Sequence, residues 1–176
     1  PQEAKSWGKI REKGKAVALE KGFGNSTGEL IGILDADTMV GKNVLRNMIV
    51  HFSDPKIGAV TNLIRVDSKK NILSKFQHIE YTVSAMTKKI LSALNALYIT
   101  PGTLSLVRRD AIKKIGFSDD TLTEDMDLAL SLIKGGYKIY HCLDAEVRTI
   151  IPKTLRSWIA QRTRWYRGYM ENMQKH

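Results

Sequence analysis

Two aspartates with a single residue between them are the first pair of side chains along the chain whose spacing suits a metal ion. Asp35 and Asp37 directly follow the continuous apolar run 30–34, which has the pattern of a strand buried on both faces. Residues two apart in an extended chain point the same way, so these carboxylates share one side and repel unless a cation lies between them. Such a pair suits Mg²⁺ or Mn²⁺, which often links carboxylates to a diphosphate. Alternatively, Asp37 or Thr38 simply caps the next helix.

A second acidic group opens a predicted helix further along the chain, where Glu124, Asp125 and Asp127 follow Thr123. Thr121 and Glu124 have the spacing of a capping box, and the helix dipole favours acidic side chains in a first turn. Capping explains Glu124 but does not require Asp125 or Asp127. A carboxylate in a closed site can serve as a general base that takes a proton from an attacking hydroxyl.

A third group combines an amide, a guanidinium and a flat aromatic ring near the end of the chain. On a helix, Gln161, Arg164 and Trp165 are three and four residues apart and share one face. Arginine matches phosphate oxygens in a bidentate manner, and tryptophan offers a surface on which a sugar ring can stack. The same segment also fits an amphipathic helix with a core-facing aromatic stripe, or a basic helix at a membrane interface.

The elements that must position these groups alternate between helix and strand, which is typical of an α/β domain. Helices are predicted over 9–21, 42–53, 71–94, 109–115, 124–134 and 154–173, and strands over 30–34, 59–66, 98–107 and 137–150. The glycine-rich segment 22–28 is expected to end the first helix, and Pro101-Gly102 to interrupt the third strand.

Composition narrows the class of protein without choosing a function. The 176 residues suit one domain, and 43% of them are apolar. A net charge of +10 favours an anionic partner, either nucleic acid, a membrane surface or a phosphorylated ligand. The single cysteine, Cys142, excludes an internal disulfide and is expected to be buried filler. No apolar run approaches the roughly 18 to 20 residues that span a bilayer, so the chain is expected to be soluble or at most surface-bound.

The three groups occur in the order Asp-x-Asp, Thr-Glu-Asp and Gln-x-x-Arg-Trp, and this ordered set resembles the processive family-two glycosyltransferases. That family includes cellulose, chitin, hyaluronan and poly-N-acetylglucosamine synthases. The sequence between the motifs also resembles that family. The similar parts are the segment 76–81, which ends in Glu80-Tyr81, the segments 101–103, 107–111 and 135–138, and Trp158. The resemblance covers nearly the whole chain.

The resemblance implies a role for each matching residue. Asp35 and Asp37 would hold Mg²⁺ or Mn²⁺ against the diphosphate of a UDP-sugar, with Asp37 the more direct ligand. Asp125 would be the general base on the acceptor hydroxyl, and Glu124 would help to shape the acceptor site. The other substrate-binding residues would be Lys15 for the nucleotide, Gly102 for the acceptor pocket, and Gln161, Arg164 and Trp165 for the diphosphate and the acceptor sugar.

The resemblance also implies an architecture. It is a GT-A-like, Rossmann-like α/β fold with a mostly parallel sheet flanked by helices, truncated on its N-terminal side and ending in an amphipathic interface helix. Residues 1–153 would form the catalytic core and 154–176 the interface helix. The expected reaction is inverting transfer of a hexose, N-acetylglucosamine or glucose, from a UDP-sugar to a growing β-glycan. The full-length protein would be embedded in the plasma membrane through helices outside these residues, with this part at the cytoplasmic face.

Two other functions fit part of the sequence. A non-processive enzyme could transfer one sugar to a lipid phosphate, but Gln-x-x-Arg-Trp marks the polymerising branch of the family. A basic nucleic-acid-binding module is permitted by the charge of +10. Zinc-finger spacing, an RNP-like strand and a helix-turn-helix signature are all missing from the sequence, which argues against nucleic acid. The anionic leaflet of a membrane explains the positive charge better.

Overall fold

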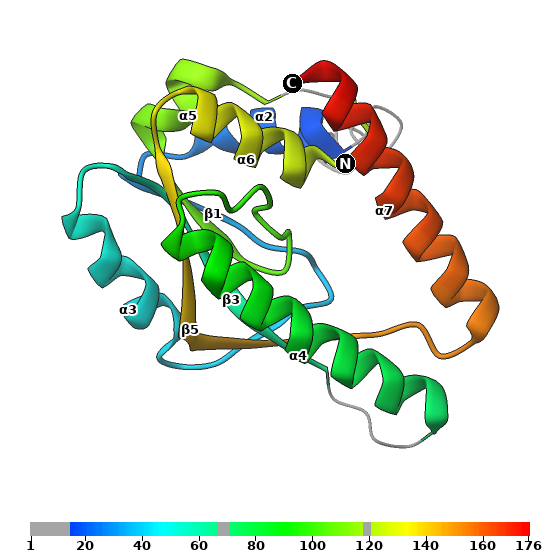
Figure 1. Ribbon diagram of the computed structural model, residues 1–176. Helices are drawn as coiled ribbons and strands as arrows, with labels where there is room; N and C mark the ends of the chain where they lie inside the picture. Colours follow the sequence, from blue (N-terminus) through cyan, green and yellow to red (C-terminus); the bar gives the residue numbers. More distant parts are fainter. Residues whose placement is uncertain (1–14, 67–70, 118–120) are drawn as a thin grey trace, which may run out of the picture.

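The computed structural model describes residues 15–66, 71–117 and 121–176. The described strands form one five-stranded sheet in the order β1-β4-β3-β5-β2. Their bounds are Leu30–Ile33 for β1, Met39–Val40 for β2, Ile57–Val66 for β3, Ser105–Arg108 for β4 and Lys138–Thr149 for β5. Figure 1 shows this sheet at the centre of the molecule with helices on both sides. The predicted α/β class is therefore confirmed.

The pairing within the sheet corrects the expectation of mostly parallel strands. Strand β3 pairs in parallel with β5, whereas β1 with β4, β4 with β3, and β2 with β5 are antiparallel. The physical reason is the segment 94–104, which follows the helix after β3. Helix α4 and this irregular segment connect β3 to β4 without the geometry of a βαβ crossover, so β4 enters the sheet running against β3. Strands β1, β3 and β5 still share one direction, with β4 inserted between β1 and β3.

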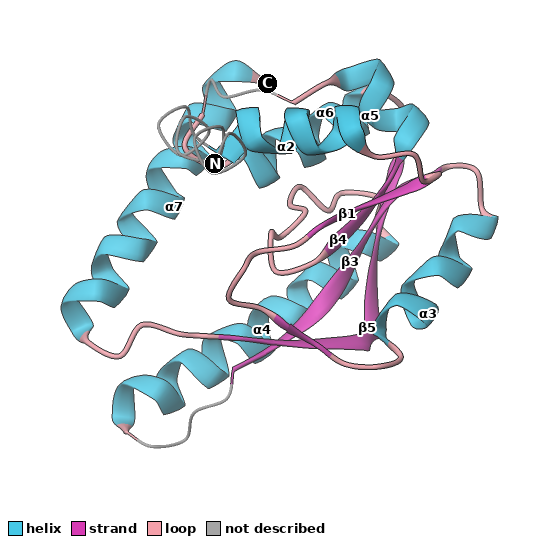
Figure 2. Cartoon of the chain, turned by 180° about the vertical axis from the view of Figure 1, so that it is seen from behind, coloured by secondary structure: helices cyan, strands magenta, loops and turns pink. Residues whose placement is uncertain are grey.

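Seven helical segments surround the sheet in the described residues. They are α2 (Lys15–Asn25), α3 (Val44–Ile49), the 3-10 turn η1 (Val50–Ser53), α4 (Ile72–Ala93), α5 (Arg109–Ile115), α6 (Glu124–Lys134) and α7 (Leu155–Lys175). Both figures of the whole chain show β5 between α3 and α4 (Figures 1 and 2). Alternate residues of a strand serve the two sides of the sheet: Ala59 belongs to the apolar core that α5 and α6 cover, and Val60 to the core beneath α3.

The two longest helices begin where the sequence predicts. Asn71 and Ser74 form a capping box at the start of α4, and Thr154 and Ser157 form another at the start of α7. The first helix differs from its prediction. Its predicted start at residue 9 lies outside the described residues, and it continues to Asn25 rather than ending at residue 21.

The aromatic side chain of Phe23 explains why α2 continues through its glycines. Its ring packs edge-on against Phe117, with ring centroids 6.1 Å apart, and against the core under α5 and α6. Glycine in a helix costs about 1 kcal/mol relative to alanine, and burial of an aromatic side chain offsets more than that.

Helix α7 begins at Leu155, and the division into a catalytic core over 1–153 and an interface helix over 154–176 stays a prediction. Helix α7 follows one side of the molecule and does not stand apart from it (Figure 1), because Arg162 is bonded to Glu80 on α4 and Asn172 to residues before α6. None of the described helices is long and apolar enough to cross a membrane. Cys142 is buried in the core beneath α3, as predicted.

Candidate active site

The loop after β1 places Asp35 against the segment that precedes β4. The backbone N–H of Asp35 donates to the carbonyl oxygen of Gly102 over 2.6 Å. A Cβ added at Gly102 would lie 2.6 Å from Asp35 Oδ2 and 2.6 Å from Lys15 Nζ, closer than such atoms ever approach. A side chain at 102 would therefore have to displace the ends of the Asp35 and Lys15 side chains, so glycine leaves room for their contact.

Lys15 joins the loop after β1 to the start of α6. Its Nζ lies 2.7 Å from Asp35 Oδ1 and 2.7 Å from Glu124 Oε1. Burial acts to lower the pKa of Lys15, but hydrogen bonds to Asp35 and Glu124 outweigh it, so the pKa is raised. The ammonium group stays charged at neutral pH and holds two carboxylates from distant parts of the chain in one place.

Glu124 does not take the capping role that its spacing from Thr121 suggests. Helix α6 begins at Glu124 with Thr123 as its N-cap, and no side chain caps it. The carboxylate of Glu124 contacts Lys15 instead. The capping alternative for Asp37 and Thr38 is also wrong, because the N-cap residue of α3 is Asn43.

Asp125 is held by the same segment that carries Gly102. Its backbone carbonyl accepts hydrogen bonds from Thr100 N at 3.2 Å and Thr100 Oγ1 at 2.7 Å. Burial raises the pKa of Asp125 to about 6 and the charge of Glu124 adds to the rise, whereas Lys15, the N–H of Met126 and Lys88 act in the opposite direction. A carboxylate with this pKa is mainly ionised at pH 7 and is a stronger base than an ordinary aspartate.

Two side chains on α4 belong to this neighbourhood although the motifs do not contain them as site residues. Burial lowers the pKa of Lys88 to about 8, and the charge of Asp125 acts against that fall. Burial raises the pKa of Tyr81, Arg162 lowers it, and Glu80 and then Asp37 raise it further. Tyr81 and Lys88 are seven residues apart, two turns along one face of the helix, and this spacing could have identified them.

The predicted face of α7 forms, but a neighbouring arginine makes the stronger contacts. Arg162 Nε lies 2.7 Å from Glu80 Oε1, its Nη1 donates to Gln161 Oε1, and its guanidinium carbon is 4.1 Å from the centroid of the Trp165 ring. Arg162 is only 7% exposed. Arg164, by contrast, is exposed, and its Nη1 lies 3.5 Å from the carbonyl oxygen of Leu122. Arg164 is therefore available to a ligand, whereas Arg162 joins α7 to α4.

The structure brings most of the predicted residues into one connected group. We call Lys15, Asp35, Gly102, Glu124 and Asp125 the carboxylate cluster. Arg164 reaches Leu122, which lies two residues before Glu124. Asp37 is exposed and forms no hydrogen bond to the cluster among the described residues, but its charge contributes to the raised pKa of Tyr81. Residues from five separate stretches of sequence thus surround one region.

Two carboxylates in the loop after β1, one of them in the carboxylate cluster, offer oxygen ligands for a divalent cation. Asp35 and Asp37 supply hard oxygen donors, and the ammonium group on Asp35 Oδ1 shows that this carboxylate attracts a cation. Among the described residues, no three His, Cys, Asp or Glu side chains are grouped so that they could enclose a metal ion. Such a donor set fits Mg²⁺ or Mn²⁺ that takes its remaining ligands from phosphate oxygens and water.

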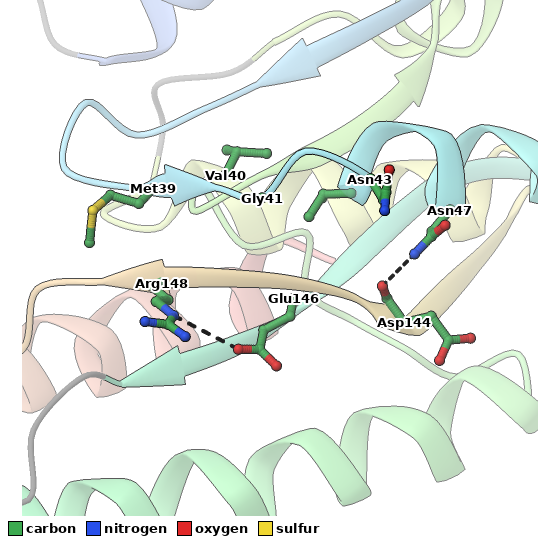
Figure 3. A pocket seen from close by; sticks show the side chains of 9 residues that line it. Met39, Val40, Gly41, Asn43, Asn47, Asp144, Glu146 and Arg148 are labelled. Carbon is green, nitrogen blue, oxygen red and sulfur yellow. Dashed lines mark hydrogen bonds and ion pairs between the residues drawn. The ribbon is translucent and has the colours of Figure 1, made fainter.

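One hollow in the described part of the chain lies away from the cluster. Figure 3 shows this hollow between β2, α3 and β5. Its volume is about 410 Å³. It is lined by Met39, Val40, Gly41, Asn43, Val44, Asn47, Asp144, Glu146 and Arg148. Asn47 Nδ2 donates to the carbonyl oxygen of Asp144 over 2.7 Å, and Arg148 pairs with Glu146. None of the predicted site residues borders this hollow.

Comparisons with known proteins give a consistent family. Residues 30–176 match the model of the glycosyl transferase family group 2. The poly-beta-1,6-N-acetyl-D-glucosamine synthase of Staphylococcus aureus strain COL is 35% identical over 159 residues, which cover 89% of this chain and 39% of that protein. The synthase of the same name from Staphylococcus epidermidis is 34% identical over 159 residues. The chain thus spans about two fifths of the length of these curated relatives.

A solved structure supports the same fold. A mannosyltransferase from Pyrobaculum calidifontis, in complex with GDP-Man and Mn²⁺, superposes with a TM-score of 0.71 at 23% identity, covering 92% of this chain and 43% of that one. The GT-A-like fold class is confirmed by this similarity. With the family match over most of its length, the chain belongs to the glycosyl transferase family group 2.

Proposed function

We propose that this chain is the catalytic part of an inverting glycosyltransferase that moves a hexose from a UDP-sugar to the end of a growing β-glycan. One observation carries the proposal. Lys15 bridges Asp35 and Glu124 with two contacts of 2.7 Å, and so brings the residues after β1 to the side of Asp125. Donor-binding and base groups must meet in this way if one displacement is to occur between two sugars.

Asp125 is the proposed general base. The acceptor hydroxyl attacks the anomeric carbon from the side opposite UDP and transfers its proton to the Asp125 carboxylate. The new carbon–oxygen bond forms as the bond between the anomeric carbon and the phosphate oxygen breaks, and that electron pair leaves with UDP. A single displacement of this kind inverts the anomeric configuration.

The leaving diphosphate is the proposed partner of the positive groups. Arg164 is exposed and presents a guanidinium fork, which suits phosphate oxygens. Gln161 and Trp165 are assigned to the diphosphate and the acceptor sugar on the same helix face. Asp35 and Asp37 are the residues that would hold Mg²⁺ or Mn²⁺, and such a cation would offset charge developing on the diphosphate.

The identity of the sugar is supported by the relatives. Two of the curated proteins with 34–35% identity are named poly-beta-1,6-N-acetyl-D-glucosamine synthases. N-acetylglucosamine is therefore the favoured sugar, with glucose as the alternative.

A membrane surface is the proposed second partner, at its cytoplasmic face. Apolar side chains are exposed along α7, including Leu155, Ile159 and Tyr166, and arginines at 156, 164 and 167 lie among them. A helix with apolar and basic side chains interleaved in this way suits an anionic bilayer interface.

The proposal is tested with full-length protein in detergent and a panel of UDP-sugars, with Mg²⁺ or Mn²⁺ added to metal-free enzyme. We expect transfer from UDP-N-acetylglucosamine or UDP-glucose, and a β-linked product whose length reports polymerisation. Transfer from none of the UDP-sugars would contradict the proposal, and a product one sugar long would favour non-processive transfer.

The metal assignment has its own test. Asp37→Ala is expected to abolish the metal-dependent part of UDP binding, measured by calorimetry with and without Mn²⁺. Asp110→Ala, an exposed carboxylate on α5, is the matched control and should behave as wild type. Metal that still strengthens UDP binding to Asp37→Ala would refute the assignment.

A further inference from the structure

The segment before α6 is tied to α7 by contacts that no motif assignment explains. The amide of Asn172 is fully buried and its Nδ2 lies 2.9 Å from Thr123 Oγ1, 3.2 Å from Thr121 Oγ1 and 3.3 Å from the Thr123 carbonyl oxygen. The adjacent residue, Glu171, accepts the backbone N–H of Leu122 with its Oε2 over 2.8 Å. All three residues that precede Glu124 are therefore hydrogen-bonded to side chains of α7.

Glycine at position 168 lets the two segments approach so closely. A Cβ there would lie 2.5 Å from both Cγ2 and Oγ1 of Thr123 and 2.9 Å from its Cβ. Thr123 is 7% exposed and packs directly on the α7 backbone. Any larger residue at 168 must push Thr123, and with it the start of α6, away from α7.

These contacts are made at the expense of ordinary stabilising ones. Thr123 is the N-cap of α6, but its hydroxyl does not cap the helix and instead meets Asn172. A side-chain N-cap stabilises a helix, and α6 lacks this contribution. Asn172 Oδ1 is buried and has no hydrogen-bond partner among the residues that the structure describes, which also costs stability. An arrangement that forgoes a cap and buries an unpaired oxygen is better explained by a need for position than by stability.

The same face of α7 carries the residue assigned to the diphosphate. Arg164, Gly168 and Asn172 are spaced at intervals of four residues, so they lie one above another on the helix. We propose that Gly168 and Asn172 are positioning residues, which hold Thr123 against α7 and thereby fix the distance between Asp125 and Arg164. This inference rests on the proposed roles of those two side chains.

The clamp, meaning Gly168 and Asn172 on α7 with Thr123, has a specific kinetic consequence. Displacing Thr123 moves the base from the attacking hydroxyl but leaves Arg164 and the residues after β1 in place. Misplacement of a reacting group by about 1 Å can cost on the order of 100-fold in rate. The rate of transfer should therefore fall while binding of the donor remains.

Gly168→Ala and Asn172→Ala are tested in the full-length protein, with Thr163→Ala as a matched control on an exposed position of α7. For both clamp variants we expect kcat to fall at least tenfold, with the KM for UDP-sugar and the Kd for UDP within about twofold of wild type. Equal loss of kcat and UDP binding would overturn the inference, because positioning of the base alone leaves donor binding intact, and unchanged kcat would overturn it as well.

A second variant separates positioning from general loss of stability. Thr123→Ala removes the methyl and hydroxyl groups that an alanine at 168 would strike. Gly168→Ala with Thr123→Ala should therefore lose less kcat than the product of the two single effects. Strictly multiplicative losses would overturn the steric argument. If Asp125→Asn retained full transfer, the proposed base would be wrong, whatever the clamp variants do.

Discussion

At the scale of single residues, Asp125 is partly buried, yet as the proposed general base it must be ionised to accept a proton. Its pKa is raised to about 6, with burial as the largest cause and the charge of Glu124 as the second. Lys15 and Lys88 act against the rise and keep the group ionised near neutral pH. The carboxylate therefore gains basicity over an ordinary aspartate without being protonated at pH 7.

This pKa predicts the acidic limb of the pH profile. As pH falls through about 6, Asp125 takes up a proton and can no longer accept one, so kcat/KM should fall about tenfold per pH unit. Transfer rates at low donor concentration between pH 4.5 and 8 measure this limb. A profile that stays flat down to pH 4.5 would show that Asp125 is not the titrating base.

The same shift predicts that Asp125 weakens the fold at neutral pH. Its pKa rises from 3.8 to about 6 on folding, so the unfolded chain loses its proton first as pH increases. Stability is fully retained below pH 4 and is reduced as pH rises through 6, by about 1–3 kcal/mol after allowance for partial exposure. Asp125→Asn should unfold at higher temperature than wild type at pH 8, with no comparable gain at pH 4. A lower unfolding temperature at pH 8 would contradict this.

At the scale of elements, the sequence predicts helices better than it predicts their contacts. The bounds of α5 and α6 are those expected, and α4 and α7 begin at polar residues that form capping boxes. Strand pairing could not be predicted in the same way, because the path of segment 94–104, which sets the direction of β4, is a property of tertiary structure. The residues of the carboxylate cluster were identifiable by type and order, but the bridge through Lys15 was not.

Two arginines on α7 show that helical spacing alone does not predict which side of a helix is buried. Arg162 and Arg164 are two residues apart, yet Arg162 is paired with Glu80 and 7% exposed, whereas Arg164 is exposed. Helical spacing places them on different sides of α7, but only the packing of α7 against α4 determines which side is buried.

This difference predicts opposite effects of one substitution at the two positions. Arg162→Met leaves the Glu80 carboxylate without its partner and should lower the free energy of unfolding by about 2–4 kcal/mol. Arg164→Met, the matched control for stability, should change it by less than about 0.5 kcal/mol but reduce transfer. Urea unfolding and transfer assays measure both quantities. Equal loss of stability in the two variants would contradict the assignment.

At the scale of the whole molecule, α4 buries polar side chains and exposes a row of apolar ones. Gln77 and Ser92 are buried against the sheet side and donate to the carbonyl oxygens of Pro152 and Ile139. Apolar residues are exposed at intervals of three and four along the outer face, namely Ile72, Phe76, Ile79, Val83, Met86 and Ile90. An exposed apolar surface of this extent is typical of a contact with a membrane or a protein. Phe76 on this face packs edge-on against Trp158 of α7, so the two helices adjoin there.

The outer face of α4 is therefore expected to contribute to membrane association. Val83→Ser with Met86→Ser should reduce binding of this chain to vesicles that contain phosphatidylglycerol, measured by co-sedimentation. Thr87→Ser, exposed on the same helix, is the control. Unchanged vesicle binding would exclude α4 from that surface.

The most direct test of the account is one comparison on the full-length protein, in which transfer and UDP binding are measured side by side for wild type and Asp125→Asn. Asparagine keeps the shape of the side chain and can still accept the N–H of Met126, but it cannot take a proton. The account predicts that transfer falls by at least about a thousandfold, which lies within the range of roughly 10²–10⁴-fold that general acid–base catalysis contributes. The Kd for UDP should change less than about threefold. Transfer within about tenfold of wild type would contradict it.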